Sequence, residues 1–206
     1  MTSKRSIERS IDTLQRIYAV IAALAFNEAL KRTFLQGGAG DVELDVTRIP
    51  EFVAFIVIAV PFLHGMNRHL DNTLSTIVQK NRRGLFVILL IDFLVFMLEA
   101  CILFLLATSV KGEFLFFRLL ILLLLVDLVW SFITWPITKS VIWRWAVVNV
   151  IAVILMAVLI RWAPFSDAAT LWVLMSVSVV RTVCDYWLAW GFYFPALEEE
   201  AEPAAT

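Results

Sequence analysis

One long apolar stretch constrains the fold of this chain more than any other feature. Residues 84–107, GLFVILLIDFLVFMLEACILFLLA, form a run of about 24 residues that is almost wholly apolar. An α-helix rises about 1.5 Å per residue, so a helix of this length crosses the hydrocarbon core of a bilayer. The stretch therefore predicts a membrane-spanning helix.

Two acids interrupt this stretch near its middle. Asp92 and Glu99 are seven residues apart, so a helix places them on one face, two turns from each other. An ionised acid at the centre of a bilayer costs at least roughly 2.5 to 3.5 kcal/mol. The rest of the chain must then supply partners, water or protons to that face.

The composition indicates a protein with several spans. Of the 206 residues, 61 % are hydrophobic, and the net charge is -1. A soluble domain of this length does not need so much apolar surface, and a net charge near zero gives no reason to expect nucleic-acid binding. The sequence has no P-loop, GxGxxG, HExxH or GxSxG motif. We therefore predict no enzymatic activity, no catalytic residue, no metal site and no cofactor.

We predict an all-α integral membrane protein, a bundle of about six transmembrane helices. A basic, amphipathic segment over 1–16 precedes the spans, and an acidic, disordered tail over 195–206 follows them. The first span is the weakest candidate because its apolar core, IYAVIAALAF, is short, so five spans are the alternative. The predicted spans are 17–34, 51–66, 84–107, 114–138, 143–162 and 168–194.

Basic residues set the predicted orientation. Most Lys and Arg residues lie in the N-terminal segment and in the loops at 67–83 and 139–144. The positive-inside rule then places both termini in the cytoplasm, and we predict a bacterial inner-membrane protein. Pro50 is placed to start the second span, and the helical pattern of that span continues past Met66 through NRHLDNTLSTIVQ.

The predicted spans bring several charged residues to similar depths. Asp127 and Arg181 fall close to mid-membrane, Asp92 and Asp185 about one turn toward the cytoplasm, and Glu99 slightly toward the outside. Arg181 can be neutralised by Asp185 on its own helix, or by Asp127 or Asp92 across the bundle. Interior acids then outnumber interior bases, so some acid is protonated, exposed to water or matched to a cation.

These interior acids have two interpretations. In the functional one, Asp92, Glu99 and Asp127 line a polar path for a cation or a proton. In the structural one, they hold helices together through one ion pair and through protonated carboxyls bonded to backbone or hydroxyl groups. Interhelical hydrogen bonds average well under about 1 kcal/mol, which is a small gain for the cost of burying an acid.

A second candidate site lies where the second span ends. His64, Arg68 and Asp71 follow at i, i+4 and i+7 on one stripe, with His69 beside it. The stripe is either a cytoplasmic gate, a pH-sensitive contact or an anionic-ligand site, because imidazole titrates near neutral pH. Alternatively it is the solvated end of a helix, with Arg68 and His69 anchored to lipid headgroups.

Three smaller features complete the candidates. Asn27 and Glu28 in the first span either line a pore or helix contact, or mark the end of a short span. Cys101 and Cys184 lie in apolar runs and are predicted to be buried structural thiols. The aromatic cluster at 187–194, WLAWGFYF, is predicted to be an interface belt.

The segment RIYAVIAALAFNEAL keeps an arginine, Arg16, ahead of a helix rich in small residues, and the second span ends with His64 and His69. In these features and in its topology the chain resembles the prokaryotic six-span potassium-channel family related to transmembrane protein 175. The Phe-Ser-Asp triplet of that family's signature is absent here. The resemblance implies a tetramer around a pore lined by the first helix, and no pore residue carries over.

The leading hypothesis is conduction of an ion or proton through a polar path among the first, third, fourth and sixth spans. The alternative is a non-catalytic membrane scaffold or sensor subunit that acts through a cytoplasmic partner protein. Its contact would be the basic 67–83 segment or the acidic tail. The predicted partners are the lipid bilayer, further copies of the chain in a homo-oligomer, and that cytoplasmic protein.

Overall fold

The computed structural model describes residues 2–34, 45–80, 84–111, 113–138, 142–162 and 165–195, and every structural statement below refers to them. Within these ranges the chain is helical and contains no strand. The elements are α1 (Thr2–Phe34), η1 (Val46–Arg48), α2 (Ile49–Lys80), α3 (Gly84–Thr108), α4 (Phe114–Thr138), α5 (Ile142–Trp162), α6 (Asp167–Leu188) and α7 (Trp190–Tyr193).

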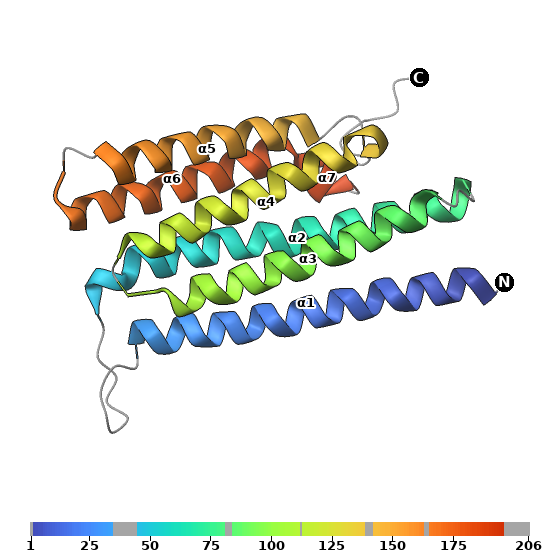
Figure 1. The fold of residues 1–206 in the computed structure, drawn as a ribbon, viewed down its shortest axis with the longest axis horizontal. Helices are drawn as coiled ribbons and strands as arrows, with labels where there is room; N and C mark the ends of the chain where they lie inside the picture. Colours follow the sequence, from blue (N-terminus) through green and yellow to red (C-terminus); the bar gives the residue numbers. More distant parts are fainter. Residues whose placement is uncertain are drawn as a thin grey trace, which may run out of the picture.

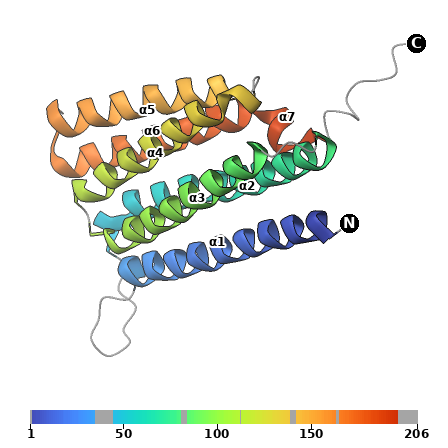
Figure 2. The same ribbon diagram turned by 45° about the vertical axis from the view of Figure 1, so that its right-hand side comes forward.

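The six long helices in the described part of the chain lie lengthwise in one bundle (Figures 1 and 2). They form a closed ring in the order α1, α3, α4, α5, α6 and α2, because each packs on the next and α2 packs on α1. Helix α2 also contacts α3 across the ring. Helices α2 to α6 therefore enclose an interior, and α1 packs against α2 and α3.

Five of these helices are long and apolar enough to cross a membrane, and the chain is a multi-pass membrane protein by this criterion. The prediction of a helical bundle with several spans is confirmed, and α1 is the helix that the criterion leaves out. Six spans and cytoplasmic termini stay predictions. The five candidate spans run over 46–72, 89–108, 114–134, 143–162 and 167–188.

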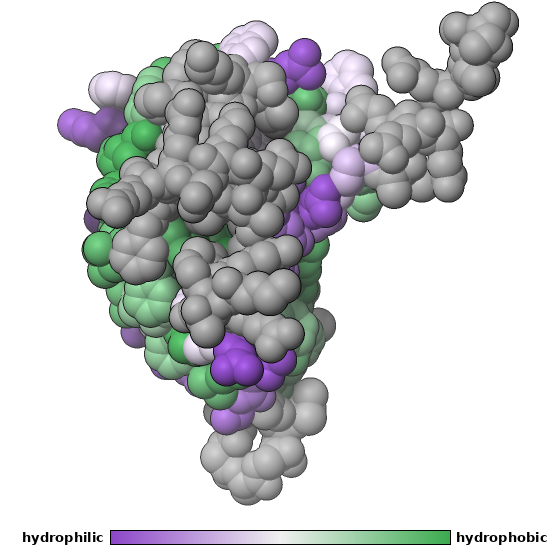
Figure 3. Space-filling view, turned by 90° about the vertical axis from the view of Figure 1, so that its right-hand side faces the viewer, coloured by the Kyte–Doolittle hydropathy of each residue, from purple (hydrophilic) through white to green (hydrophobic). Residues whose placement is uncertain are grey.

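The outer surface of the bundle fits a bilayer. Trp143 and Trp162 bracket α5 and are both exposed, as interface anchors should be. They are separated by about 28 Å of helix, close to the roughly 30 Å of a hydrocarbon core. Seen end-on from the side where α1 begins, much of the described flank is apolar (Figure 3).

The prediction that the cysteines are buried is wrong for Cys101, which is exposed, and Cys184 is only partly buried. Cys101 follows the inward-facing Glu99 by two residues, which rotates it about 200° around the helix to the outer surface. An apolar run shows that a residue lies in the membrane, but it does not show which face of the helix carries it.

Helix α1 is one continuous helix, so the N-terminal segment and the predicted first span form a single element. Its buried residues recur every three or four positions, and those toward the C-terminal end of the helix have small side chains. Its outward apolar face is short, since Asp12 and Arg16 are exposed before it and Asn27 after it. The inward stripe consists of Ile11, Leu14, Tyr18, Ala22, Ala25 and Ala29.

Two helix ends are informative. Helix α2 contains Pro50 in its first turn and includes Pro61, and it continues to Lys80, as the sequence pattern past Met66 predicts. Helix α6 ends at Leu188, whereas the predicted span continued to residue 194. The backbone of Ala189 leaves the helical region, with φ -114° and ψ 26°, and the short helix α7 follows.

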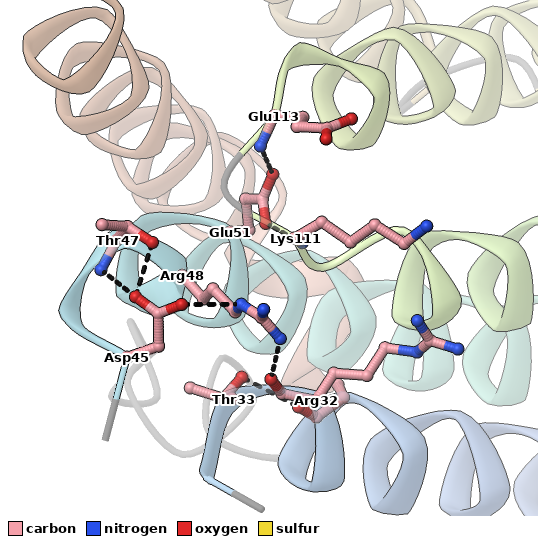
Figure 4. Close-up of polar contacts among 9 residues, drawn as sticks. Arg32, Thr33, Asp45, Thr47, Arg48, Glu51, Lys111 and Glu113 are labelled. Carbon is pink, nitrogen blue, oxygen red and sulfur yellow. Dashed lines mark hydrogen bonds and ion pairs between the residues drawn. The ribbon is translucent and has the colours of Figure 1, made fainter. Parts of the chain in front are cut away.

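A group of polar contacts joins three connections at one end of the bundle (Figure 4). The buried Glu51 at the start of α2 accepts hydrogen bonds from the backbone N–H of Lys111 at 2.7 Å and of Glu113 at 2.8 Å. Arg48 pairs with Asp45 at 3.0 Å and donates to the carbonyl of Arg32 at 2.6 Å. The start of α2 therefore holds both the end of α1 and the turn before α4.

Candidate functional site

The interior of the ring contains a small cavity that several charged side chains reach. Its volume is about 20 Å³, which is enough for about one water molecule. Gly65 lies against it, and a side chain there would meet the Trp145 indole at 3.3 Å. The charged and hydrogen-bonding residues that line the cavity are Glu99, Asp127, Trp130, Trp145, Arg181, Asp185 and Tyr193.

Arg181 and Asp185 form the buried ion pair of this cavity. The guanidinium Nη1 of Arg181 lies 3.0 Å from Oδ2 of Asp185, one turn later on α6. The hydroxyl of Tyr193 on α7 donates to the same carboxylate at 3.2 Å. Of the three acids considered for Arg181 from the sequence, its own helix supplies the one that pairs with it directly.

Asn149 connects this ion pair to a second acid. Its side-chain oxygen accepts hydrogen bonds from Nε and Nη2 of Arg181 at 2.9 and 2.7 Å, and its side-chain amide donates to Asp127. These three residues come from α6, α5 and α4, and the contacts place them at one level of the bundle. Asn149 thus bridges Arg181 and Asp127 by hydrogen bonds to both side chains.

Glu99 lies at the same cavity but is held differently. It is only 2 % exposed, and its Oε1 has no hydrogen-bond partner within the described residues. The hydroxyl of Tyr18 on α1 is likewise buried without a hydrogen-bond partner in those ranges, and it interacts electrostatically with Glu99. Asp92 and Asp127 also act on Glu99 electrostatically. Glu99 therefore faces the cavity without a partnering base.

A second polar group lies beside the cavity. Nε2 of His69 on α2 is 2.9 Å from Oδ2 of Asp92 on α3, and the indole N–H of Trp130 on α4 donates to Oδ1 of Asp92 at 2.9 Å. All three side chains are buried. The interpretation of His69 as a headgroup anchor is wrong, because its position five residues after His64 turns it inward, away from the stripe.

The rest of the stripe at the end of α2 makes separate contacts. Arg68 donates to the carbonyl of Phe192 on α7 at 3.1 Å, and Nδ1 of His64 is 3.4 Å from the Tyr186 hydroxyl. Asp71 instead accepts a hydrogen bond from Gln15 on α1 at 3.3 Å. His64 and Arg68 therefore contact the end of α6 and helix α7, whereas Asp71 contacts α1.

Asn27 and Glu28 do not take part in the interior network. Asn27 is exposed on the outer face of α1, and Glu28 forms an ion pair with Arg32 at 2.7 Å. The structure thus brings together Asp92, Glu99, Asp127, Arg181 and Asp185 around one interior. The predicted contacts at 81–83 and in the tail from 196 onward lie outside the described residues.

Sequence reasoning missed the aromatic members of the site. Tyr193 belongs to a cluster that was interpreted as an interface belt, and within that cluster Trp187 is indeed 77 % exposed. Tyr18 and Trp130 gave no separate signal because each lies in an apolar run. Asn149 was recognisable as the only strongly polar residue inside its span.

Comparison of the chain with protein-family models, with curated proteins and with solved structures found no match. The resemblance to the six-span potassium-channel family therefore stays a prediction. What the site can do has to be argued from its own geometry.

Proposed function

We propose that this protein binds protons inside the membrane and transfers them along the interior of its helix bundle. The observation that carries the proposal is Glu99, a buried carboxyl whose Oε1 has no hydrogen-bond partner in the described ranges and which lines a cavity the size of one water. A buried carboxyl with no base beside it is more stable neutral, holding a proton, and a neighbouring water can carry that proton away.

The charge balance of the interior supports this proposal. Among the described residues, the polar interior holds the acids Asp92, Glu99, Asp127 and Asp185. Arg181 contributes one positive charge, and His69 contributes another only when it is protonated. The acids cannot all be ionised at mid-membrane at an acceptable cost, so the interior must hold exchangeable protons or a cation.

The packing favours a proton over a metal cation as the transferred species. The aromatic side chains of Phe96, Trp130 and Trp145 fill the space around the cavity, which has a volume of about 20 Å³. A metal cation would need several oxygen ligands and an open path, whereas a proton needs only a chain of hydrogen-bonding groups and a water.

Two finer features belong to this proposal. Helix α1 crosses the membrane as a sixth span, since it lies along α2 and α3 (Figure 1). Its Tyr18 side chain is fully buried. Both termini then lie on the same side, which the basic residues assign to the cytoplasm of a bacterial cell. The buried stripe of α1, with Ala22, Ala25 and Ala29, supports the close helix contact that this requires.

Proton flux into liposomes tests the function. The purified protein is reconstituted with a trapped pH-sensitive dye, and an imposed pH gradient drives uptake. We expect flux from the wild-type protein and its loss in Glu99→Gln, which cannot hold the exchangeable proton. Glu113→Gln is the matched control, since Glu113 is an exposed acid outside the cavity. Absence of wild-type flux from folded, inserted protein would overturn the proposal, and so would unchanged flux in Glu99→Gln.

A further inference from the structure

The second polar group of the interior differs from the cavity in its surroundings. His69, Asp92 and Trp130 come from three different helices and are joined by two contacts of 2.9 Å. The imidazole lies between two aromatic rings, with centroids 4.6 Å from Trp130 and 6.0 Å from Phe96. An imidazole and a carboxylate in contact can share one proton between them.

We infer that His69 and Asp92 form a second proton-binding site, which Phe96 and Trp130 separate from the cavity at Glu99. The pair is neutral with one shared proton, whichever residue carries it, and gains or loses one unit of charge on exchange. It lies toward the end of the bundle where α2 ends. The pair is therefore placed to exchange protons between that end and the cavity.

The spacing along α3 shows what separates the two proton-binding sites. Asp92 and Glu99 are separated by about 10 Å of helix, too far for direct proton transfer. Phe96 lies between them on the same helix, and its ring packs against Trp130 at 5.5 Å and against Tyr18 at 6.5 Å. Both Phe96 and Trp130 also line the cavity. The rings therefore close the gap that a water would have to cross.

The proposed step conserves atoms and charge. Once Glu99 has released the proton that it holds, the pair passes its shared proton to a water that enters beside Phe96, and that water passes a proton to the Glu99 carboxylate, forming an O–H bond there. The pair, left with one negative charge, then takes a replacement proton from hydronium at the end of α2. The step needs no oxidant, reductant or further group. It rests on the proposed function, because Glu99 is the acceptor.

Several titratable groups lie around the pair. Glu99 on α3 interacts electrostatically with Asp92, and Tyr18 on α1 packs against Phe96 beside it. Arg68 and Asp71 are sequence neighbours of His69 on α2, and the Phe96 and Trp130 rings that pack against the imidazole are uncharged.

Histidine resonances test this inference directly, because the chain has only two histidines. The full-length protein, labelled with ¹⁵N at histidine, is measured in detergent, with His64→Gln as the variant that leaves the His69 imidazole alone. We expect the ¹⁵N shifts of this imidazole to show a proton shared between Nε2 and the Asp92 carboxylate. We expect this signal to persist in Glu99→Gln and to be lost in Asp92→Asn. Identical His69 shifts with and without the Asp92→Asn substitution in folded protein would overturn the inference.

Flux measurements separate this inference from the proposed function. Asp92→Asn and His69→Gln should reduce proton flux roughly 100-fold, the lower end of what a positioned proton-transfer group contributes. Phe96→Leu, which removes the aromatic partition but keeps an apolar core residue, should raise flux above wild type. If Glu99→Gln abolishes flux while Asp92→Asn and His69→Gln leave it unchanged, the second site is wrong and the proposed function stands. If wild-type protein shows no flux, the histidine resonances still decide whether the pair binds a shared proton.

Discussion

The guanidinium of Arg181 and the carboxylate of Asp185 lie 3.0 Å apart, one turn from each other on α6, and both side chains are buried. Each therefore neutralises the other inside a segment that crosses the membrane. Because Arg181 also donates two hydrogen bonds to Asn149, this one residue holds the cavity side of α6 against α5. The stability of this region should depend on the charge of Arg181 more than on its size.

The first prediction concerns this pair. Arg181→Met should lower the free energy of unfolding by about 3 to 5 kcal/mol, because it leaves the Asp185 carboxylate buried and unpaired. The double variant Arg181→Met, Asp185→Asn should regain part of the loss, since no uncompensated charge remains. Thermal unfolding in detergent measures both, with Arg161→Met as the control because Arg161 is exposed. Equal stability of the single and double variants would contradict the prediction.

The second prediction concerns the hydrogen bond from Trp130 to Asp92. Trp130→Phe keeps an aromatic ring but removes the N–H that donates at 2.9 Å. We expect a loss of about 1.5 to 3 kcal/mol, the usual range for a hydrogen bond to a charged group. Trp187→Phe is the matched control because Trp187 is 77 % exposed. If the two substitutions lower the melting temperature equally, the hydrogen bond contributes nothing of its own.

The third prediction concerns the end of the bundle shown in Figure 4. Glu51→Ala removes the acceptor for the backbone N–H groups of Lys111 and Glu113. We expect a loss of about 1.5 to 3 kcal/mol and faster amide hydrogen exchange in the turn before α4. Glu113→Ala, at an exposed side chain, should change neither quantity. Unaltered exchange at residues 111 and 113 in Glu51→Ala would show that the carboxylate does not hold the turn.

The helices were predictable from the sequence because their signal is local. A run of apolar residues long enough to cross a bilayer sets a span whatever its neighbours are, and the predicted bounds of α3 and α4 lie within one residue of the helix ends. The end of α6 was missed because Trp190 to Phe194 are as apolar as the span before them. Only the backbone at Ala189 separates α7 from α6.

The site was predictable only in part. Acids inside apolar runs identified Asp92, Glu99 and Asp127 as interior residues, since lipid cannot accommodate them. Their partners depend on which helices are neighbours in the ring, and the sequence does not contain that order. His69 is an example of a residue whose partner the sequence did not reveal. Its place beside a polar stripe favoured the surface, yet the contact of α2 with α3 gives it Asp92 as a partner.

The last prediction concerns whether α1 crosses the membrane. Its outward apolar face is short, which is why the hydropathy criterion leaves α1 out, but its inward face packs along α2 and α3. In a background of Cys101→Ser and Cys184→Ser, single cysteines at Ser10 and at Lys31 would lie near opposite ends of α1. If α1 is a span, a membrane-impermeant thiol reagent applied to intact cells should label Lys31→Cys, and should label Ser10→Cys only after permeabilisation. Labelling of both positions from one side would show that α1 does not cross, and the bundle would then have five spans. Tyr18 would still reach the interior in that case, because its contact with Phe96 does not depend on where the membrane lies.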